Sequence, residues 1–339
     1  MLELNKIHQG DCIELMKQID DNSVDMILCD LPYGTTFCSW DIIIPLDKLW
    51  EQYKRILKSN GNIVLTSTQP FTSMLINSNI SMFKYEWIWI KNKTVGFTYC
   101  KTQPLRNTEN VLVFANGNYE YSNNPEGREY FNEMRKYIGK SIKEINTIMG
   151  NRFAEHCFYY KGKQFNLPDK KTYEKLTELF NLKKWDGYIN FEFLIKLGIK
   201  YNPQGLIKKD KPKLVNKKDN GGEWVYNIKS LTGKDYFVEF ENYPRQTLFI
   251  DCEKNTFHPT QKPVALFEYL IKTYTNEGDL VLDSTIGSGT TAIASINTKR
   301  NFIGMELEQK YVDIANKRIS EINIQTTLKE VTLGNSSQK

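Results

Sequence analysis

The feature that most constrains this chain is a short apolar run that ends abruptly in a carboxylate. Residues 26–29 have the length and composition of a buried parallel strand. They lead directly into Asp30-Leu31-Pro32-Tyr33-Gly34, where proline and glycine stop both strand and helix. Because ligands of open α/β sheets bind beyond the carboxyl ends of the strands, we expect this segment to lie in a functional site.

The residue types after this strand suit one chemistry, methylation of an exocyclic amino group on a nucleobase. Such a nitrogen is a poor nucleophile because its lone pair is delocalised into the ring. Asp30 and the carbonyl of Leu31 can accept its two N–H bonds, and Tyr33 offers a face for a base taken out of the stack. An ordinary turn with a buried tyrosine explains the same residues, so the rest of the chain has to decide.

The hydrophobic pattern around this segment predicts alternating strands and helices, and therefore a mainly parallel sheet. In the first part of the chain we predict strands at 4–8, 24–29, 61–67, 85–90 and 110–114, with helices at 12–20, 46–58 and 70–76. The last two strands are expected to pair antiparallel at the sheet edge. The pattern resumes later with a helix at 264–274, a strand at 278–283, a helix at 290–297, a strand at 301–306 and a helix at 308–321.

Residues 116–247 differ from the rest in charge and pattern. They hold 24 Lys and Arg against 17 Asp and Glu, a surplus that suits a nucleic-acid-facing region but also fits the lysine bias of an AT-rich genome. Ser141 and Glu144 predict a capping box for a helix at 141–149, and a second helical segment at 152–160 follows Gly150. The pair resembles a helix-turn-helix, which would make Arg152 a DNA contact, although helical hairpins serve many other purposes.

A third helix is expected at 171–181, and a lysine-rich segment follows it at 208–218. This segment has the composition of a solvated, mobile loop that contacts DNA phosphates. The candidate contacts are Lys208, Lys209, Lys211, Lys213, Lys217 and Lys218.

A glycine-rich turn after strand 278–283 predicts a nucleotide-type ligand site. Gly287 and Gly289 let the backbone approach a ligand closely, and the first amides of helix 290–297 attract negative charge. Glu306, at the end of the next strand, stands where an acid can bind ribose hydroxyls. The glycines alone leave a dinucleotide open, but no other residue supplies hydride chemistry, and the absence of Gly-Lys-Ser/Thr excludes a Walker loop.

Cysteine spacing and hydropathy indicate the cellular compartment of the protein. The six cysteines show no CxxC spacing, which argues against a zinc site or a disulfide framework and fits a reducing cytoplasm. The start of the sequence lacks the features of a signal peptide, and no run approaches 18 apolar residues. We therefore expect a soluble cytoplasmic protein without a membrane segment.

Three motifs in a fixed order resemble those of the β-group amino-methylating DNA methyltransferases. They are Asp30-Leu-Pro-Tyr33, His258-Pro-Thr-Gln-Lys-Pro263 and Asp283-x-x-x-Gly287-Ser-Gly289-Thr290. The resemblance covers residues 1–115 and about 248–322, leaving 116–247 as an inserted, mainly helical target-recognition region and 323–339 as a flexible tail. It implies a circularly permuted, Rossmann-like sheet of seven strands in which strand 4–8 lies beside strand 301–306.

The resemblance also implies S-adenosylmethionine as cofactor, without a metal, and assigns residues to it. The amino-acid end would contact Asp283, Gly287, Gly289 and Thr290; Glu306 would bind the ribose, and Asp11 and Cys12 the adenine. Thr260 and Lys262 would close over the methionine part, and Asp30 would face both cofactor and base. Leu31 replaces a usual proline, and Thr285 an aromatic residue that would contact the cofactor.

The function implied is site-specific methylation of double-stranded DNA. Asp at the start of the motif favours adenine N6, with Asp30, Leu31, Pro32 and Tyr33 as the catalytic segment and Trp40 beside the flipped base or in the core. Cytosine-N4 methylation, RNA methylation and an inactive nucleic-acid-binding subunit are the alternatives. The recognition sequence, a homodimer and a companion restriction nuclease stay open.

Overall fold

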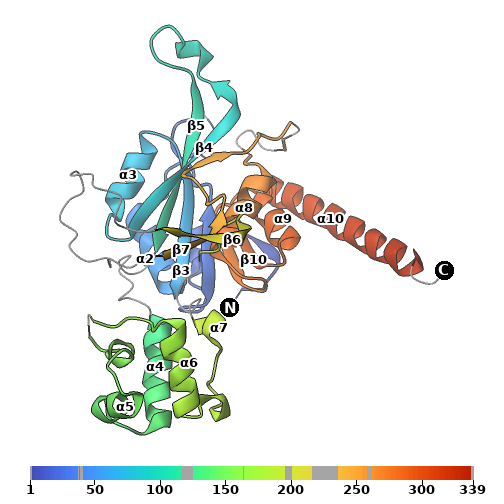
Figure 1. Ribbon diagram of the computed structural model, residues 1–339. Coiled ribbons are helices and arrows are strands. Elements are labelled where there is room, and N and C mark those ends of the chain that lie inside the picture. Colours follow the sequence, from blue (N-terminus) through green and yellow to red (C-terminus); the bar gives the residue numbers. More distant parts are fainter. Residues whose placement is uncertain are drawn as a thin grey trace.

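The protein is built around one eight-stranded sheet with helices on both faces, and a separate helical unit is attached to it (Figure 1). The computed structural model describes residues 2–36, 38, 41–115, 125–162, 164–194, 201–215, 236–254, 256–257 and 261–336. The strand order is β1-β10-β9-β2-β3-β5-β4-β8. Only the pairs β3/β5 and β5/β4 in this sheet are antiparallel, so the prediction of a mainly parallel α/β sheet is confirmed.

The sheet and the helices that cover it come from both ends of the chain. The N-terminal elements are β1 (Lys6–Gln9), α1 (Cys12–Met16), β2 (Val24–Cys29), α2 (Leu46–Ile56), β3 (Leu57–Ser67), α3 (Phe71–Ser78), β4 (Phe83–Val95), the 3₁₀ helix η1 (Phe97–Tyr99) and β5 (Arg106–Ala115). The C-terminal elements are β8 (Thr247–Phe249), α8 (Val264–Tyr274), β9 (Leu280–Asp283), α9 (Thr290–Asn297), β10 (Asn301–Glu306) and α10 (Gln309–Ser336).

Strand β2 lies inside the sheet, between β9 and β3, and its side chains are buried on both faces. Successive side chains of a strand point to opposite faces. Ile27 therefore packs into the core formed with α1, α2 and α3, whereas Leu28 packs into the core formed with α8. This arrangement carries the end of β2, and Asp30 after it, to the carboxyl edge of the sheet.

The predicted permutation of the sheet is confirmed. Strand β1 pairs in parallel with β10, with Lys6 opposite Ile303 and Gln9 opposite Glu306. The chain thus begins beside one of its last strands. The sheet has eight strands instead of seven because β8, which follows the insert, pairs in parallel with β4 and takes the edge position predicted for the β4/β5 pair.

Several predicted boundaries in the sheet domain are wrong. The first helix ends at Met16 instead of residue 20, and the second ends at Ile56 because β3 already begins at Leu57. The segment predicted to be a flexible tail from residue 323 is helical as far as Ser336. Residues 309–333 contain no glycine or proline, so nothing in the sequence stops α10 earlier.

The inserted region forms a helical unit and a small sheet. Its elements are α4 (Pro125–Ile138), α5 (Ile142–Met149), η2 (Glu155–Phe158), α6 (Lys170–Leu179), η3 (Leu182–Lys184), α7 (Phe191–Leu194), β6 (Ile207–Val215) and β7 (Tyr236–Glu241). The capping box of Ser141 and Glu144 is present, and Gly150 ends α5 at φ +70°. The helical unit has its own core, which includes Phe131 and Tyr173.

Two predictions in the insert are wrong. The segment 152–160 contains only the short 3₁₀ helix η2, whose Cys157 and Phe158 are buried in the core of the helical unit. The two segments therefore do not form a helix-turn-helix. The lysine-rich segment is not a loop up to Val215, because β6 pairs antiparallel with β7.

Among the described residues, no helix is long and apolar enough to span a membrane.

Candidate active site

Acidic side chains gather where neighbouring strands end. Asp30 follows β2, Asp283 ends β9 and Glu306 ends β10, and these three strands are adjacent and parallel. Asp11 follows β1, the next strand in the sheet. The topology therefore brings together, at one edge, residues that are far apart in the sequence, as expected for an open α/β sheet.

The Asp30 carboxylate is held by three hydrogen-bond donors. Its Oδ1 accepts from the hydroxyls of Tyr33 (2.7 Å) and Thr66 (2.5 Å), and its Oδ2 accepts from Nζ of Lys262 (2.7 Å). An ionised carboxylate offers about four lone-pair sites. Three are engaged, so one site remains for an incoming N–H group, and the orientation of the carboxylate is set before a substrate arrives.

Lys262 belongs to a row of alternating charges. Its side chain is 6% exposed and lies between Asp30 and Glu109, whose Oε2 is 3.4 Å from Nζ, while Lys91 pairs with the other oxygen of Glu109 at 2.7 Å. Burial lowers the pKa of Lys262, but the charges of Asp30 and Glu109 outweigh burial and raise the pKa above its usual value. Lys262 therefore remains a cation at neutral pH.

Tyr33 is fixed as well. Its ring stacks on Phe71, with centroids 5.2 Å apart and planes at 26°, so a flipped base can meet only the part of the ring that Phe71 leaves uncovered. Burial, together with the charge of Asp30, raises the pKa of the Tyr33 hydroxyl well above its usual value. The hydroxyl is thus a neutral donor to Asp30.

The loop that follows Tyr33 is clamped by Asp41. Its carboxylate accepts from the amides of Gly34 (2.9 Å), Thr35 (2.9 Å) and Thr36 (2.7 Å). Burial alone would raise the pKa of Asp41, but these hydrogen bonds lower it below its usual value. Trp40, predicted beside the base, lies outside the described residues.

The glycine turn is supported from within. Asp283 is buried and accepts from the amide of Thr285 (3.0 Å) and from the hydroxyl of Thr291. Burial raises the pKa of Asp283 to about 7. Its oxygens are therefore bonded to the turn and helix α9, and Asp283 shapes the turn that was predicted to contact the cofactor.

The glycines of this turn differ in what surrounds them. Gly287 has φ +53°, and a Cβ built on it would meet no atom within 4 Å, which leaves room for a ligand. Gly289 has φ +87° and caps α9, but a Cβ there would lie 2.9 Å from the Cβ of Ala315 in α10. Of these two glycines, Gly287 is therefore the one that faces open space.

Glu306 closes the turn from the neighbouring strand. Its Oε2 accepts from the amide of Gly287 and its Oε1 from the amide of Glu308, both at 2.9 Å. Burial raises the pKa of its carboxyl group. Each oxygen keeps a lone pair, so Glu306 retains the capacity to accept from hydroxyl groups.

The other predicted cofactor residues are placed as follows. Asp11 caps α1, where its carboxylate accepts from the amides of Ile13 (2.9 Å) and Glu14 (3.1 Å). Cys12 is buried, and burial raises the pKa of its thiol to about 12. Thr290 is buried and donates to the carbonyl of Lys262 (3.3 Å), whereas Thr260 lies outside the described residues.

Sequence reasoning missed three residues of this site. Thr66 donates a hydrogen bond directly to Asp30, whereas Glu109 contacts Lys262, which in turn contacts Asp30. The hydroxyl of Thr285 donates to the Asp30 carbonyl at 3.1 Å. Thr285, which the sequence presents only as the replacement of an aromatic residue, thus links the two functional loops. Thr66 could have been flagged because it stands near the end of predicted strand 61–67, at the edge where ligands bind.

The predicted DNA contacts are not gathered at this edge. Arg152 is exposed, pairs with Glu155 and belongs to the helical unit. This unit follows β5 in the chain, and β5 ends at the amino edge of the sheet (Figure 1). Lys208, Lys209, Lys211 and Lys213 lie on β6, with only the first two side chains described. Lys217 and Lys218 lie outside the described residues. The structure therefore brings none of these residues next to Asp30.

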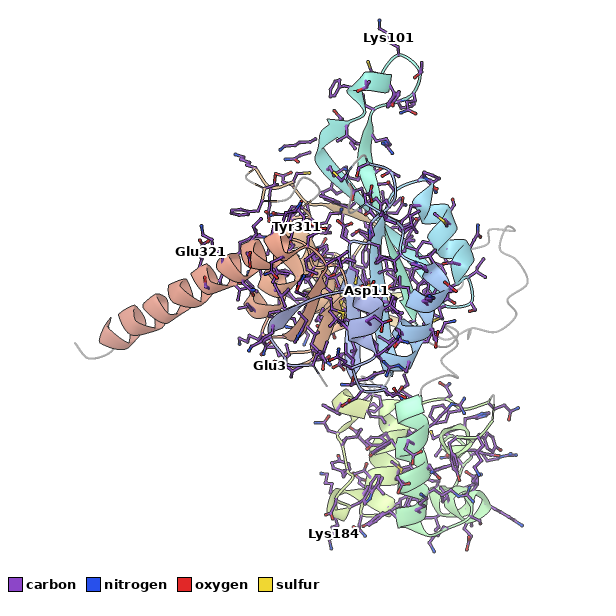
Figure 2. The ribbon with its side chains drawn as sticks, turned by 180° about the vertical axis from the view of Figure 1, so that it is seen from behind. Glu3, Asp11, Lys101, Lys184, Tyr311 and Glu321 are labelled. Carbon is purple, nitrogen blue, oxygen red and sulfur yellow. The ribbon has the colours of Figure 1, made fainter. Side chains whose placement is uncertain are left out.

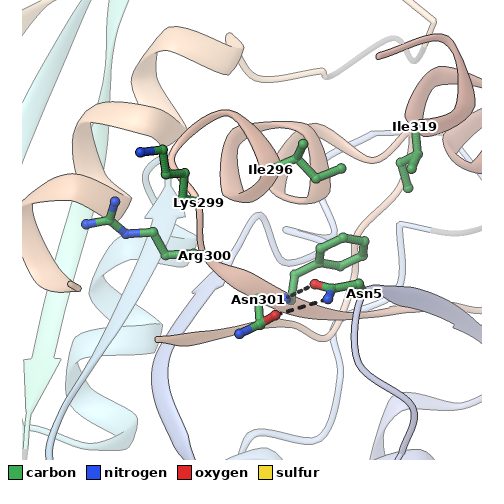
Figure 3. A pocket seen from close by; sticks show the side chains of 7 residues that line it. Asn5, Ile296, Lys299, Arg300, Asn301 and Ile319 are labelled. Atoms are coloured by element: carbon green, nitrogen blue, oxygen red, sulfur yellow. Dashed lines mark hydrogen bonds between the residues drawn. The ribbon is translucent and has the colours of Figure 1, made fainter. Parts of the chain in front are cut away.

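A cavity of about 380 Å³ lies at the opposite edge of the sheet (Figure 3). It is lined by Asn5, Arg300 and Asn301, among others, and the Asn5 amide donates to Asn301 at 3.0 Å. Asn301 begins β10 whereas Glu306 ends it, so the cavity is separated from Asp30 by the length of a strand. Among the described residues, no group of three His, Cys, Asp or Glu side chains could hold a metal ion.

The parallel sheet, its acidic strand ends and its glycine turn define a Rossmann-like α/β protein with a ligand site at the carboxyl edge. A profile of the DNA methylase family matches residues 24–317. Because this match spans most of the sequence, the chain belongs to the DNA methylase family. This confirms the predicted class, a DNA methyltransferase that uses S-adenosylmethionine.

Several known proteins are similar to this chain over most of its length. The Type II methyltransferase M2.MboI of Moraxella bovis is 45% identical over 328 residues, which cover 93% of this chain and 88% of the relative. The Type II methyltransferase M.BglI of Bacillus subtilis is 26% identical over 344 residues, covering 95% and 88%. The solved complex of M1.HpyAVI with SAM is 20% identical, with a TM-score of 0.49, and the alignment covers 92% of this chain and 98% of that one.

Proposed function

We propose that this DNA methylase transfers the methyl group to the exocyclic amino nitrogen of a flipped base in double-stranded DNA, with adenine N6 as the target. The observation that carries the proposal is the Asp30 carboxylate at the carboxyl edge, held by three donors with one lone-pair site left. A carboxylate positioned in this way can accept an N–H bond and later the proton.

The catalytic segment supplies a second acceptor in the Leu31 carbonyl. The Leu31 side chain is 4% exposed and packs into the core with α2, which anchors the backbone between Asp30 and Pro32. A carboxylate and the backbone carbonyl of the next residue supply one acceptor for each of the two hydrogens of an amino group. Together they draw the nitrogen lone pair out of conjugation with the ring and align it for attack.

The residues at the carboxyl edge fit S-adenosylmethionine. Gly287 leaves open space at the turn, Glu306 retains lone pairs for ribose hydroxyls, and the amides at the start of α9 favour a carboxylate. When bound, the cofactor supplies an electrophilic methyl group on a sulfonium, which is already a good leaving group. The chain then has to orient the amino group, exclude water and accept its proton.

The remaining assignments belong to this proposal. Residues 1–115 and 248–322 form the catalytic domain, and the basic insert 116–247 selects the target sequence. Asp30 supports adenine as the target base, because the cytosine-N4 members of the β-group amino-methylating DNA methyltransferases more often begin this motif with serine. Asp11 and Cys12 contact the adenine of the cofactor, and Tyr33 supports the flipped base.

The test is transfer of labelled methyl groups from S-adenosylmethionine to unmethylated duplex DNA and, separately, to RNA, followed by mass spectrometry of the nucleosides. We expect N6-methyldeoxyadenosine from DNA. N4-methyldeoxycytidine would replace adenine by cytosine as the target, methylated RNA would select the RNA alternative, and no transfer would leave a binding subunit.

The residue assignment is tested by Asp30→Ala. Loss of a proton acceptor lowers kcat by about a hundredfold or more, with cofactor affinity close to that of the wild type. Asp47→Ala is the matched control, since Asp47 is an exposed carboxylate in the first turn of α2. Similar kcat values for the two variants would exclude Asp30 as the acceptor.

A further inference from the structure

Strands β4 and β5 continue beyond the sheet as a two-stranded arm, which we define as residues 92–108 (Figure 1). Strand β5 runs antiparallel to both β3 and β4, so β4 runs parallel to β3 and leaves the sheet at its carboxyl edge. The arm therefore projects from the edge at which Asp30 lies. Figure 2 shows Lys101 of the arm and Lys184 of the helical unit at opposite ends of the molecule.

The charge of the arm has one sign. It contains Lys93, Lys101 and Arg106 but no aspartate or glutamate, and all three side chains are exposed. Within the described part of the chain, none of these three forms an ion pair. The arm thus presents cations with no acidic partner in the described structure, whereas Lys91 at its base is paired with Glu109.

The tip of the arm exposes aromatic side chains. Phe97 is 66% exposed and Tyr99 60% exposed, and Val95 beside them is 45% exposed. The tip is nevertheless well defined, because Gly96 takes φ +92° and its carbonyl accepts from the amide of Tyr99 at 2.9 Å. The rings are therefore presented to solvent by an ordered turn and need no rearrangement to meet a partner.

We propose that the β4–β5 arm is a DNA-binding element that enters a groove beside the target base. The inference rests on the proposed function and deepens it by naming a surface that holds the duplex at the catalytic edge. A major groove is about 12 Å wide and admits a two-stranded β-ribbon. The three cations face phosphates, and Phe97 and Tyr99 pack against sugars and base edges.

The position of the arm explains how a duplex can be held at the edge of the sheet where Asp30 lies. The helical unit, on which DNA recognition was predicted, is attached at the amino edge of the sheet. A base that reaches Asp30 has to come from the carboxyl edge, so its duplex has to be held there. Within the described residues, the arm is the basic, aromatic element that extends from that edge.

The experiment compares two triple variants with the same change in net charge. The arm variant is Lys93→Gln, Lys101→Gln and Arg106→Gln. The control variant is Lys6→Gln, Lys17→Gln and Lys299→Gln, whose lysines are exposed and lie outside the arm. Affinity for a fluorescent 30-base-pair duplex is measured by anisotropy between 50 and 200 mM NaCl, and affinity for S-adenosylmethionine by calorimetry.

For the arm variant we expect the slope of log affinity against log salt to fall by about 2.7, which is about 0.9 for each phosphate that the arm no longer neutralises. The control slope stays near that of the wild type, and cofactor affinity is unchanged in both. A separate Phe97→Ala, Tyr99→Ala double variant weakens DNA binding by about tenfold or more. Circular dichroism checks that each variant folds.

Equal slopes for the arm and control variants would overturn the proposal. So would a change in oligomeric state by sedimentation with unchanged DNA affinity, since the arm would then bind another copy of the chain. The outcomes separate this inference from the proposed function. A wild type that methylates DNA without dependence on the arm refutes only the arm, and arm-dependent binding without methyl transfer refutes only the enzyme assignment.

Discussion

Removing the positive charge of Lys262 is expected to affect stability and activity in opposite ways as pH changes. Lys262→Met keeps a chain of similar length but leaves Asp30 and Glu109 facing the space where the cation was. The side chain of Lys262 is 6% exposed, that of Glu109 13% and that of Asp30 22%, so water replaces little of the missing interaction.

The size of the effect follows from this burial. Breaking a buried ion pair by removing one partner destabilises a protein by about 3–5 kcal/mol, because the other charge stays buried. Proton uptake by a carboxylate relieves that cost. The stability deficit of Lys262→Met is therefore largest at high pH and shrinks as the pH falls.

Activity follows the reverse trend. Only the carboxylate form of Asp30 can take up the proton of the amino group, and Lys262→Met removes the cation that pairs with this form at 2.7 Å. We expect methyl transfer by Lys262→Met to be nearly lost at pH 6 and partly recovered at pH 8.5. A residue with a purely structural role would lose activity in parallel with stability.

Urea unfolding and single-turnover methylation, each at pH 6 and pH 8.5, measure the two trends. Lys17→Met is the matched control, because Lys17 and Glu14 form an exposed pair at 2.7 Å worth about 0–1 kcal/mol. A deficit for Lys262→Met no larger than that of the control would refute the buried charge row. A deficit independent of pH would show that the change in packing, not the change in charge, is responsible.

Two further predictions concern the glycine turn. Gly287→Ala should raise the cofactor Kd several-fold in calorimetry because its Cβ enters the open space at the turn. Gly278 is equally open at φ +86° but precedes β9, so Gly278→Ala should lower the free energy of unfolding by roughly 1–2 kcal/mol, the cost of the left-handed conformation, and leave cofactor affinity unchanged. Equal cofactor affinities would remove Gly287 from the site. Because burial raises the pKa of Asp283 to about 7, the folded state holds a proton that the unfolded state loses near pH 4, so the free energy of unfolding should fall by up to roughly 4 kcal/mol between pH 4 and 7. Asp283→Asn should flatten this part of the urea-unfolding profile, and an unchanged profile would contradict the assignment.

The sequence by itself determined the local elements and the order of the functional segments. Apolar runs of strand length, the breakers after Asp30 and Asp283 and the capping box at Ser141 act between neighbours in the chain, so they can be recognised without a structure. Motif order then predicted the permuted sheet, and the pairing of β1 with β10 confirmed it. Element ends were less well predicted, since α2 stops where β3 begins to pair.

Only the tertiary structure decided what surrounds Asp30. Thr66 and Glu109 reach the Asp30–Lys262 pair because β2, β3 and β5 lie in register at one edge, and such register depends on the whole sheet. The edge position of β8 and the direction of the β4–β5 arm likewise could not be predicted from the sequence. Each depends on pairings between segments far apart in the chain, whose energies no local pattern records.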